Sequence, residues 1–124
     1  LKKITNIVKF FKKKNTTFTI LLTNHTKIKK LNKKFRNKNK FTDVLSFPYF
    51  NKKDLEITKK KNIYIGDIAI SYKAILERSK KENFLLEFDK VWIHGLLHLV
   101  GYDHVKNKDY YTMSKEEKRI LSSV

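Results

Sequence analysis

Apolar residues recur along the chain with two different periods, and these periods predict where helices and strands lie. Spacings of three and four residues predict helices over residues 1–14, 26–35, 72–82, 85–100 and 109–121. Runs rich in β-branched and aromatic residues predict strands over residues 16–23, 41–47 and 63–70. Residues 49–62 are rich in lysine and have no period, so we expect a mobile surface loop there.

Individual residues set several of these boundaries. Pro48 ends the strand before it because proline cannot donate a hydrogen bond to a sheet. Ser71 is suited to cap the helix that follows it. The strand over residues 63–70 is almost continuously apolar, which is typical of a central strand. His25 falls between a strand and a helix, where we expect a turn or capping residue.

Strands interleaved with helices predict an α+β (α/β) fold, with a single layer of helices on a small mixed β-sheet. The helix over residues 85–100, which carries histidines, is expected to be central to that layer. The 124 residues contain no repeat or linker, so we expect one domain over residues 1–124. No apolar run approaches the ~20 residues of a transmembrane helix, and no signal peptide opens the chain. The sequence therefore predicts a cytoplasmic protein without a membrane partner.

The chain carries 29 Lys and Arg against 12 Asp and Glu, a formal net charge of +17. Such a surface attracts polyanions, of which nucleic acid and anionic membranes are the usual examples. Lys, Asn and Ile are also abundant together, as in products of AT-rich genomes, so the charge alone leaves an RNA-binding role open. The absence of cysteine excludes disulfides and thiolate zinc sites, which leaves histidine and carboxylate as metal ligands.

Three of the four histidines lie within eleven residues and have the spacing of a metal site. His94 and His98 are one helical turn apart, so their rings leave the same face of a helix. Gly101 can adopt a positive φ and turn the chain, which would bring His104 back toward the other two. A lone histidine on an apolar face is usually a packed, hydrogen-bonded residue, but three imidazoles among leucines are costly to desolvate without a ligand. The pattern predicts one zinc ion per chain with an open coordination position, typical of catalytic sites. Three imidazoles also suit nickel, copper or iron, so the residues alone leave the metal open.

The histidine segment has two alternative interpretations. The same spacing occurs in metzincin proteases, where a glutamate after the first histidine serves as general base. Gly95 stands at that position here, so a zinc peptidase would have its metal ligands but lack its base. The second alternative is a non-enzymatic RNA-binding module with a structural metal. An open coordination position argues against it, and a closed shell of four ligands would favour it.

The segment His94-Gly95-x-x-His98-x-x-Gly101-Tyr102-Asp103-His104 resembles that of the bacterial YbeY family of ribosomal-RNA maturation endoribonucleases. Three further stretches fit the family in order and spacing: LNKKFR at 31–36, TDVLSFP at 42–48 and GDI at 66–68. The resemblance covers most of the chain from about residue 17 onward. Members of the family commonly open with a further strand before the first helix, so the resemblance leaves open whether more residues precede Leu1.

The resemblance implies a metal-dependent endoribonuclease specific for single strands, with zinc as the expected ion. The implied roles are ribosomal-RNA processing, including maturation of the 3′ end of small-subunit rRNA, and quality control of defective ribosomes. The implied partners are single-stranded RNA, ribosomal RNA and the ribosome, and not DNA; the oligomeric state stays open. The resemblance also implies His94, His98 and His104 as the metal ligands and Arg36 as the basic residue that faces them.

Each candidate residue has a chemical role that suits phosphodiester hydrolysis. Zinc lowers the pKa of its bound water to about 7, so a metal-bound hydroxide can attack the phosphorus. Arg36 can donate two hydrogen bonds to a phosphate, although a solvated loop charge is the alternative. Asp43 or Asp67 could orient a ligand histidine from behind, or simply bond to backbone. Asp103 suits a turn, with a fourth ligand or a base as alternatives; no general acid stands out.

Overall fold

The structure is a computed structural model that describes residues 15–51, 54–55, 59, 61–80, 83–102 and 107–122. Its helices and strands, in chain order, are β1 (Asn15–Thr23), α2 (His25–Arg36), β2 (Val44–Pro48), β3 (Asn62–Ser71), α4 (Tyr72–Ser79), α5 (Phe84–Leu99) and α6 (Asn107–Leu121). These elements confirm the α+β class, the mixed sheet and the histidine-bearing helix. The helix predicted over residues 1–14 lies outside the described part of the chain.

The three strands form one sheet in the order β1-β3-β2, so β3 is central as predicted. β1 runs parallel to β3, and β2 runs antiparallel to it. The register of β1 against β3 shifts between Thr17 and Phe18, beside Gly66. Gly66 has a φ of +145°, and a Cβ there would overlap the carbonyl oxygen of Phe47 on β2. Glycine is therefore required where the three strands come together.

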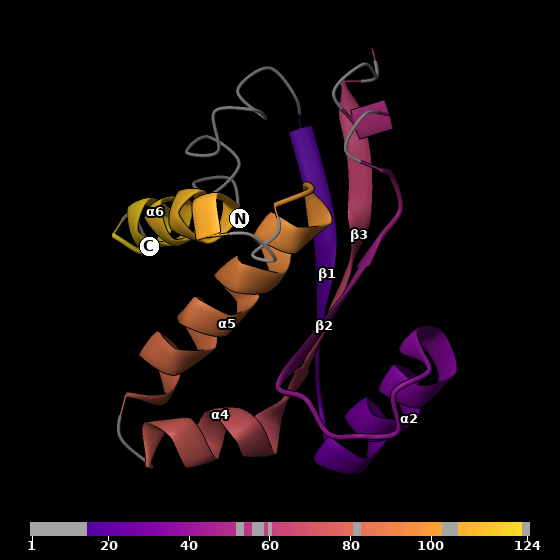
Figure 1. Cartoon of the computed structure of the whole chain (residues 1–124), viewed down its shortest axis with the longest axis vertical. Coiled ribbons are helices and arrows are strands. Elements are labelled where there is room, and N and C mark those ends of the chain that lie inside the picture. The colour runs from indigo at the N-terminus through magenta and orange to yellow at the C-terminus, as the bar shows by residue number, and fades with distance from the viewer. Residues whose placement is uncertain are drawn as a thin grey trace.

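Helices cover both faces of the sheet, which corrects the prediction of a single helical layer (Figure 1). Alternate residues of β3 point to opposite faces. Ile68 and Ile70 belong to the main core with α5, whereas Ala69 packs with Ile28 of α2 and Leu45 of β2 in a second cluster. Both faces of β3 are apolar, so each must be shielded from water, and α2 supplies the second cover.

The histidine-bearing helix α5 lies against the sheet at Gly95. A Cβ on Gly95 would lie 2.8 Å from Ile68 Cγ2, 3.2 Å from Ser46 Oγ and 3.3 Å from Val44 Cγ2. Metzincins have a catalytic glutamate at the position of Gly95. In this chain α5 packs tightly against the sheet at that position. Its side of the helix faces the sheet and has no room for a general base.

A Gly95→Ala substitution should lower the free energy of unfolding by roughly 1–2 kcal/mol. Overpacking a core costs about 1–3 kcal/mol, whereas alanine in a helix interior gains about 1 kcal/mol over glycine. Three contacts below 3.4 Å put the packing cost in the upper part of that range. Urea denaturation of the variant measures the difference. Adding Ile68→Ala removes the methyl group that clashes, so the two substitutions together should cost less than the sum of their separate effects.

The structure agrees with the predicted boundaries to within two residues, except that α4 ends and β2 begins three residues from the predicted positions. Ser71 caps α4 by accepting a hydrogen bond from the Ala74 amide, as predicted. β2 begins at Val44 rather than at residue 41, because Phe41 stacks on His25 and does not enter the sheet. Leu55, in the segment predicted as a surface loop, is fully buried in the main core and anchors that segment. Over the described residues, no helix has the length and apolar character needed to cross a membrane.

Candidate active site

His94 and His98 lie one turn apart on α5, and their rings meet edge to face. Their ring centroids are 4.6 Å apart, and the two Nε2 atoms are 3.1 Å apart. Both side chains line one cavity, and both are partly exposed, although most of the other residues in this turn of α5 are buried. The helix therefore presents two imidazole nitrogens at the same point of an open cavity.

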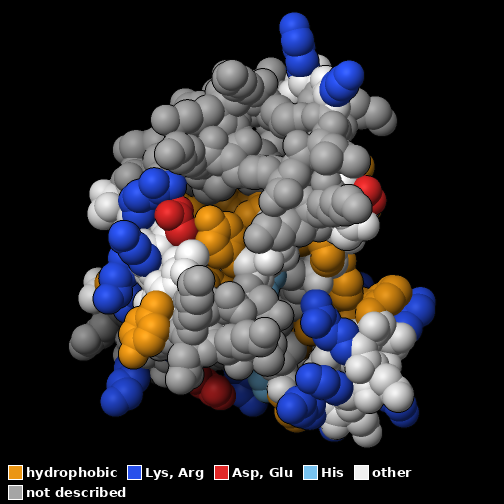
Figure 2. All heavy atoms as spheres, turned by 45° about the horizontal axis from the view of Figure 1, so that its top comes forward, with side chains coloured by type: hydrophobic (Ala, Val, Ile, Leu, Met, Phe, Trp, Pro, Cys, Tyr) orange, Lys and Arg blue, Asp and Glu red, His pale blue; other side chains and the backbone are white. Residues whose placement is uncertain are grey.

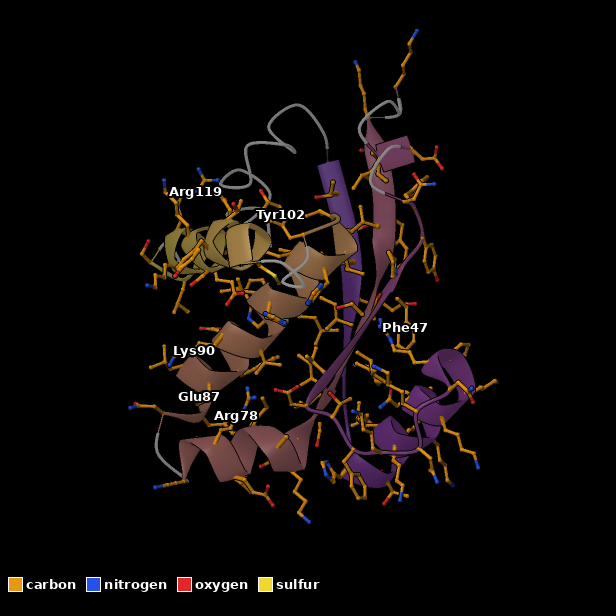
Figure 3. All side chains as sticks on the ribbon, viewed as in Figure 1. Phe47, Arg78, Glu87, Lys90, Tyr102 and Arg119 are labelled. Atoms are coloured by element: carbon orange, nitrogen blue, oxygen red, sulfur yellow. The ribbon has the colours of Figure 1, made fainter. Side chains whose placement is uncertain are left out.

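The opposite nitrogen of each ring is held by an acceptor. His94 Nδ1 lies 3.0 Å from Glu117 Oε1 on α6, and His98 Nδ1 lies 3.0 Å from the Tyr102 carbonyl oxygen. A carboxylate oxygen and a carbonyl oxygen are acceptors, so each Nδ1 donates to its partner, and in a neutral imidazole held in this way the Nε2 presents a lone pair. The Tyr102 carbonyl reaches His98 because Gly101 turns the chain with a φ of +97°, as the sequence predicts. Figure 3 shows Tyr102 where α5 ends beside α6.

This arrangement fits a metal centre. Two lone pairs that face each other across 3.1 Å repel unless a proton or a metal cation lies between them, and an open cavity that exposes both atoms gives a metal room to bind there. Two nitrogen ligands of one tetrahedral zinc, with Zn–N bonds of about 2.0–2.1 Å, are separated by about 3.3–3.4 Å. His104 and Asp103 lie outside the described residues, and within that part of the chain no group of three potential ligands gathers. The three-histidine site therefore stays a prediction, although the structure does bring His94 and His98 together.

Arg36 is connected to the histidine helix through Ser46 of β2. Its guanidinium donates to the Ser46 carbonyl oxygen at 2.6 Å, and the buried Ser46 hydroxyl donates to the Gly95 carbonyl oxygen at 2.9 Å. An arginine has five N–H donors, so this contact leaves others for a ligand. Arg36 lines the same cavity as His94 and His98, as predicted for the basic residue of the site.

The cavity is long, open and cationic on one side. Its volume is about 880 Å³, and it runs between α5, β2 and the segment that follows α2. Arg36, Lys38 and Lys40 line it, against Asp43. Figure 2 shows lysine and arginine side chains gathered at the lower right of the view, the side on which α2 lies in Figure 1. Tyr102 also lines the cavity, and burial raises the pKa of its hydroxyl above the ordinary 10.0, so the group stays protonated at neutral pH.

The structure gives Asp43 and Asp67 partners other than a histidine. Asp43 forms an ion pair with Arg78 of α4 at 2.5 Å. Asp67 accepts hydrogen bonds from the hydroxyls of Tyr64 and Tyr49, the latter at 3.3 Å. The carboxylate behind His94 is Glu117, which corrects the expectation that Asp43 or Asp67 would take that place.

Glu117 was missed in the sequence, although a signal for it exists. Met113 and Ile120 are buried on one stripe of α6, and Glu117 lies four residues after the first and three before the second. A carboxylate on the apolar stripe of an amphipathic helix needs a partner, because burying an unpaired charge is costly. Here that partner is His94.

A Glu117→Gln variant should bind zinc about 10- to 100-fold more weakly than the parent. The amide still accepts a hydrogen bond, but it no longer raises the basicity of His94 as a carboxylate does. Competition with a chromophoric chelator measures the dissociation constant. Glu116→Gln is the matched control, since Glu116 pairs with Arg119 on the same helix. Equal zinc affinity in the Glu117 variant and the control would argue against this role.

Comparison with known proteins identifies the family. The family model described as Endoribonuclease YbeY matches residues 1–124. A Pelagibacter ubique protein named Endoribonuclease YbeY is 52% identical over 130 residues, which cover 96% of this chain and 80% of that protein. A Thermodesulfovibrio yellowstonii protein of the same name is 39% identical over 117 residues, covering 90% of this chain and 70% of the relative.

A solved structure agrees with this result. The solution structure of a Thermotoga maritima protein is 27% identical in sequence and has a TM-score of 0.63, over 98% of this chain and 73% of that one. The match extends to the whole described fold, including the helix that presents His94 and His98. The sequence motifs, the architecture and the two sets of relatives agree, and the chain belongs to the YbeY endoribonuclease family.

Proposed function

We propose that this endoribonuclease cleaves single-stranded ribosomal RNA and that it depends on one zinc ion held by His94, His98 and His104. The observation that carries the metal is the pair of Nε2 atoms 3.1 Å apart, each on a ring whose Nδ1 is already held. The membership of the family supports RNA as the substrate. Within ribosome biogenesis, we propose 3′-end maturation of small-subunit rRNA and removal of defective ribosomes as its roles.

The residues in and around the cavity have different roles in the proposed hydrolysis. Bound zinc would supply a nucleophile near neutral pH and a Lewis acid for the phosphate. Glu117 and the Tyr102 carbonyl hold the two rings in the tautomer that exposes Nε2. Arg36 donates hydrogen bonds to the non-bridging phosphate oxygens, where charge grows in the transition state. Lys38 and Lys40 attract the flanking phosphates without reading sequence.

The features of the cavity favour RNA over a peptide. A zinc peptidase needs a general base beside the metal, and Gly95 supplies none. A run of basic side chains along the cavity suits a phosphate backbone, whose binding weakens steeply as salt is added. The proposal therefore predicts salt-sensitive binding of RNA and no turnover of peptides.

The test uses untagged protein, because a histidine tag would itself bind metal. Elemental analysis should find about one zinc per chain, and the same sample should cleave single-stranded RNA much faster than duplex RNA. A chelator should abolish cleavage, and added zinc should restore it. Cleavage that persists in metal-free protein would overturn the proposed mechanism. Stoichiometric metal without any cleavage would instead favour a structural metal.

A further inference from the structure

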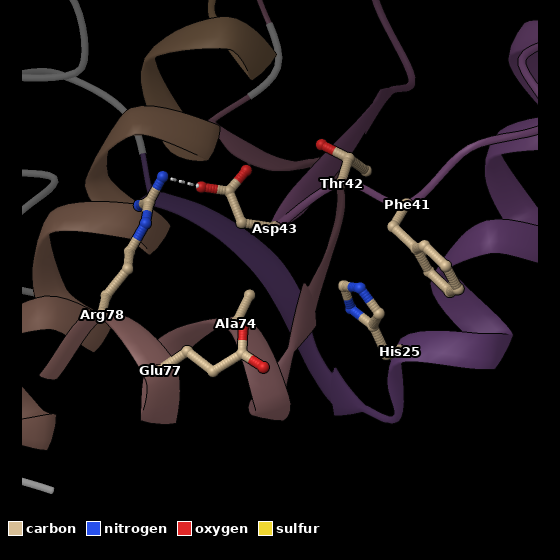
Figure 4. Close-up of a pocket in the computed structure, with 7 residues that line it drawn as sticks. All are labelled: His25, Phe41, Thr42, Asp43, Ala74, Glu77 and Arg78. Carbon is tan, nitrogen blue, oxygen red and sulfur yellow. Dashed lines mark ion pairs between the residues drawn. The ribbon is translucent and has the colours of Figure 1, made fainter. Parts of the chain in front are cut away.

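A second hollow adjoins the cavity that holds the histidines. Its volume is about 500 Å³, and its walls come from the start of α2, the segment before β2, and α4. It is lined by His25, Phe41, Thr42, Asp43, Ala74, Glu77 and Arg78. Figure 4 shows the His25 ring between the Phe41 ring and the Asp43–Arg78 pair. We call this hollow the side pocket.

One wall of the side pocket is an aromatic platform. The rings of His25 and Phe41 are stacked, with centroids 4.0 Å apart and planes 9° apart. His25 Nδ1 lies 2.9 Å from Ser71 Oγ, and this fully buried hydroxyl also caps α4. The orientation of the platform is therefore fixed by two helix ends. Phe41 is 49% exposed, and its ring already has His25 stacked on it and Lys29 Nζ over it at 4.8 Å from the centroid, so a ligand in the side pocket would stack on the outer face of His25.

The opposite wall is polar and unsuited to phosphate. Asp43 and Arg78 form an ion pair 2.5 Å long, and Glu77 adds a second carboxylate. Both carboxylates are already paired, Asp43 with Arg78 and Glu77 with Lys73 at 4.0 Å, so this wall offers no net positive charge to a phosphate group. The same carboxylates can accept hydrogen bonds from ring N–H and amino groups at the edge of a nucleobase. A flat aromatic face and a polar wall with acceptors and donors together match a base better than an anion.

The side pocket is continuous with the cationic cavity. Phe41, Thr42 and Asp43 line both hollows, so the short segment that they form is the rim between them. On the far side of this rim, Lys38, Lys40 and Arg36 line the cavity that leads to His94 and His98. If the phosphates of an RNA strand lie along these lysines, the unpaired bases of that strand can turn over the rim into the side pocket.

We propose that the side pocket is a subsite for one unpaired nucleobase of the RNA substrate, which stacks on the His25–Phe41 platform. This inference rests on the proposed function, and it adds a physical reason for a preference for single strands. A base held in a duplex is stacked and paired on both sides and cannot enter the side pocket. The side pocket therefore recognises, by its shape, that the nucleotide at one fixed distance from the cleaved bond is unpaired.

The experiment combines removal of one base from the RNA with removal of one aromatic side chain from the protein. A short single-stranded RNA with one cleavage site is prepared with an abasic ribose at each position in turn, and kcat/KM is measured with the full-length, zinc-loaded protein. Base–aromatic stacking predicts a loss of roughly 5- to 150-fold at one position. In Phe41→Ala and His25→Ala variants, the intact RNA should already show that loss, and the abasic RNA should show no further one.

Control variants separate stacking from structural damage. Phe41→Trp keeps an aromatic face and should keep the position-dependent loss. Tyr111→Ala removes a 73% exposed ring from α6 and should behave as the parent. An abasic penalty that persists unchanged in both alanine variants, or no penalty at any position, would overturn the subsite while leaving the nuclease intact. Without any cleavage the proposed function fails, and the same scan read by fluorescence anisotropy of bound RNA still decides the subsite.

Discussion

A His98→Ala variant is expected to lose its metal and at least about a thousand-fold in RNA cleavage rate, yet still bind RNA. The ring is held at Nδ1 by the Tyr102 carbonyl, so its Nε2 has one fixed direction, toward His94. A metal contributes several kcal/mol to such a reaction, and each 1.36 kcal/mol corresponds to about ten-fold in rate. Elemental analysis and single-turnover cleavage of a labelled RNA measure the two losses.

The controls for this variant use the remaining histidines and the salt dependence of binding. His25 lies in the side pocket, so His25→Ala should keep about one metal per chain. The lysines and Arg36 are untouched in His98→Ala, so the slope of log affinity against log salt should equal that of the parent. A His98→Ala protein that retains both metal and cleavage would show that the catalytic centre lies elsewhere.

An Arg36→Ala variant should lower kcat by about 100- to 1,000-fold, the effect of removing one aimed donor from a developing anion. The guanidinium is fixed by the Ser46 carbonyl at 2.6 Å, so it is already oriented before substrate binds. Arg36→Lys restores the charge but not the planar fork, and it should recover only part of the rate. Metal content should be unchanged, which separates this defect from that of His98→Ala.

Lys30→Ala is the matched control for Arg36. Lys30 is an exposed residue of the same helix and carries the same charge, but it does not line the cavity. The control should lower affinity for RNA slightly at low salt and leave kcat as in the parent. Equal effects on kcat from the two substitutions would mean that Arg36 acts only through overall charge.

The local elements could be predicted because they depend on neighbouring residues. The apolar period predicts α5 and α6 within a few residues, and Ser71 and Gly101 act as the cap and the turn that their types favour. Two histidines one turn apart must share a helix face, so the approach of His94 to His98 could be predicted from their spacing. The central position of β3 followed from its continuous apolar run.

The parts that could not be predicted depend on contacts between distant segments. Glu117 reaches His94 across 23 positions, and only the packing of α6 on α5 brings them together. Helices cover both faces because Ala69 meets Ile28 of α2, a pairing that no local period encodes. Phe41 looks like the start of a strand, yet stacking on His25 takes it out of the sheet.

The close packing of Gly95 limits how this enzyme could be redesigned for a metal other than the proposed zinc. The helix that carries His94 and His98 is in direct contact with β2 and β3 at Gly95, directly after His94, so close packing resists any sliding or rotation that would suit another ionic radius. Substitutions within α5 will therefore tend to unfold the protein before they alter metal choice. Glu117, on a separate helix, can be exchanged without moving α5, and libraries that aim at a new metal preference should begin there.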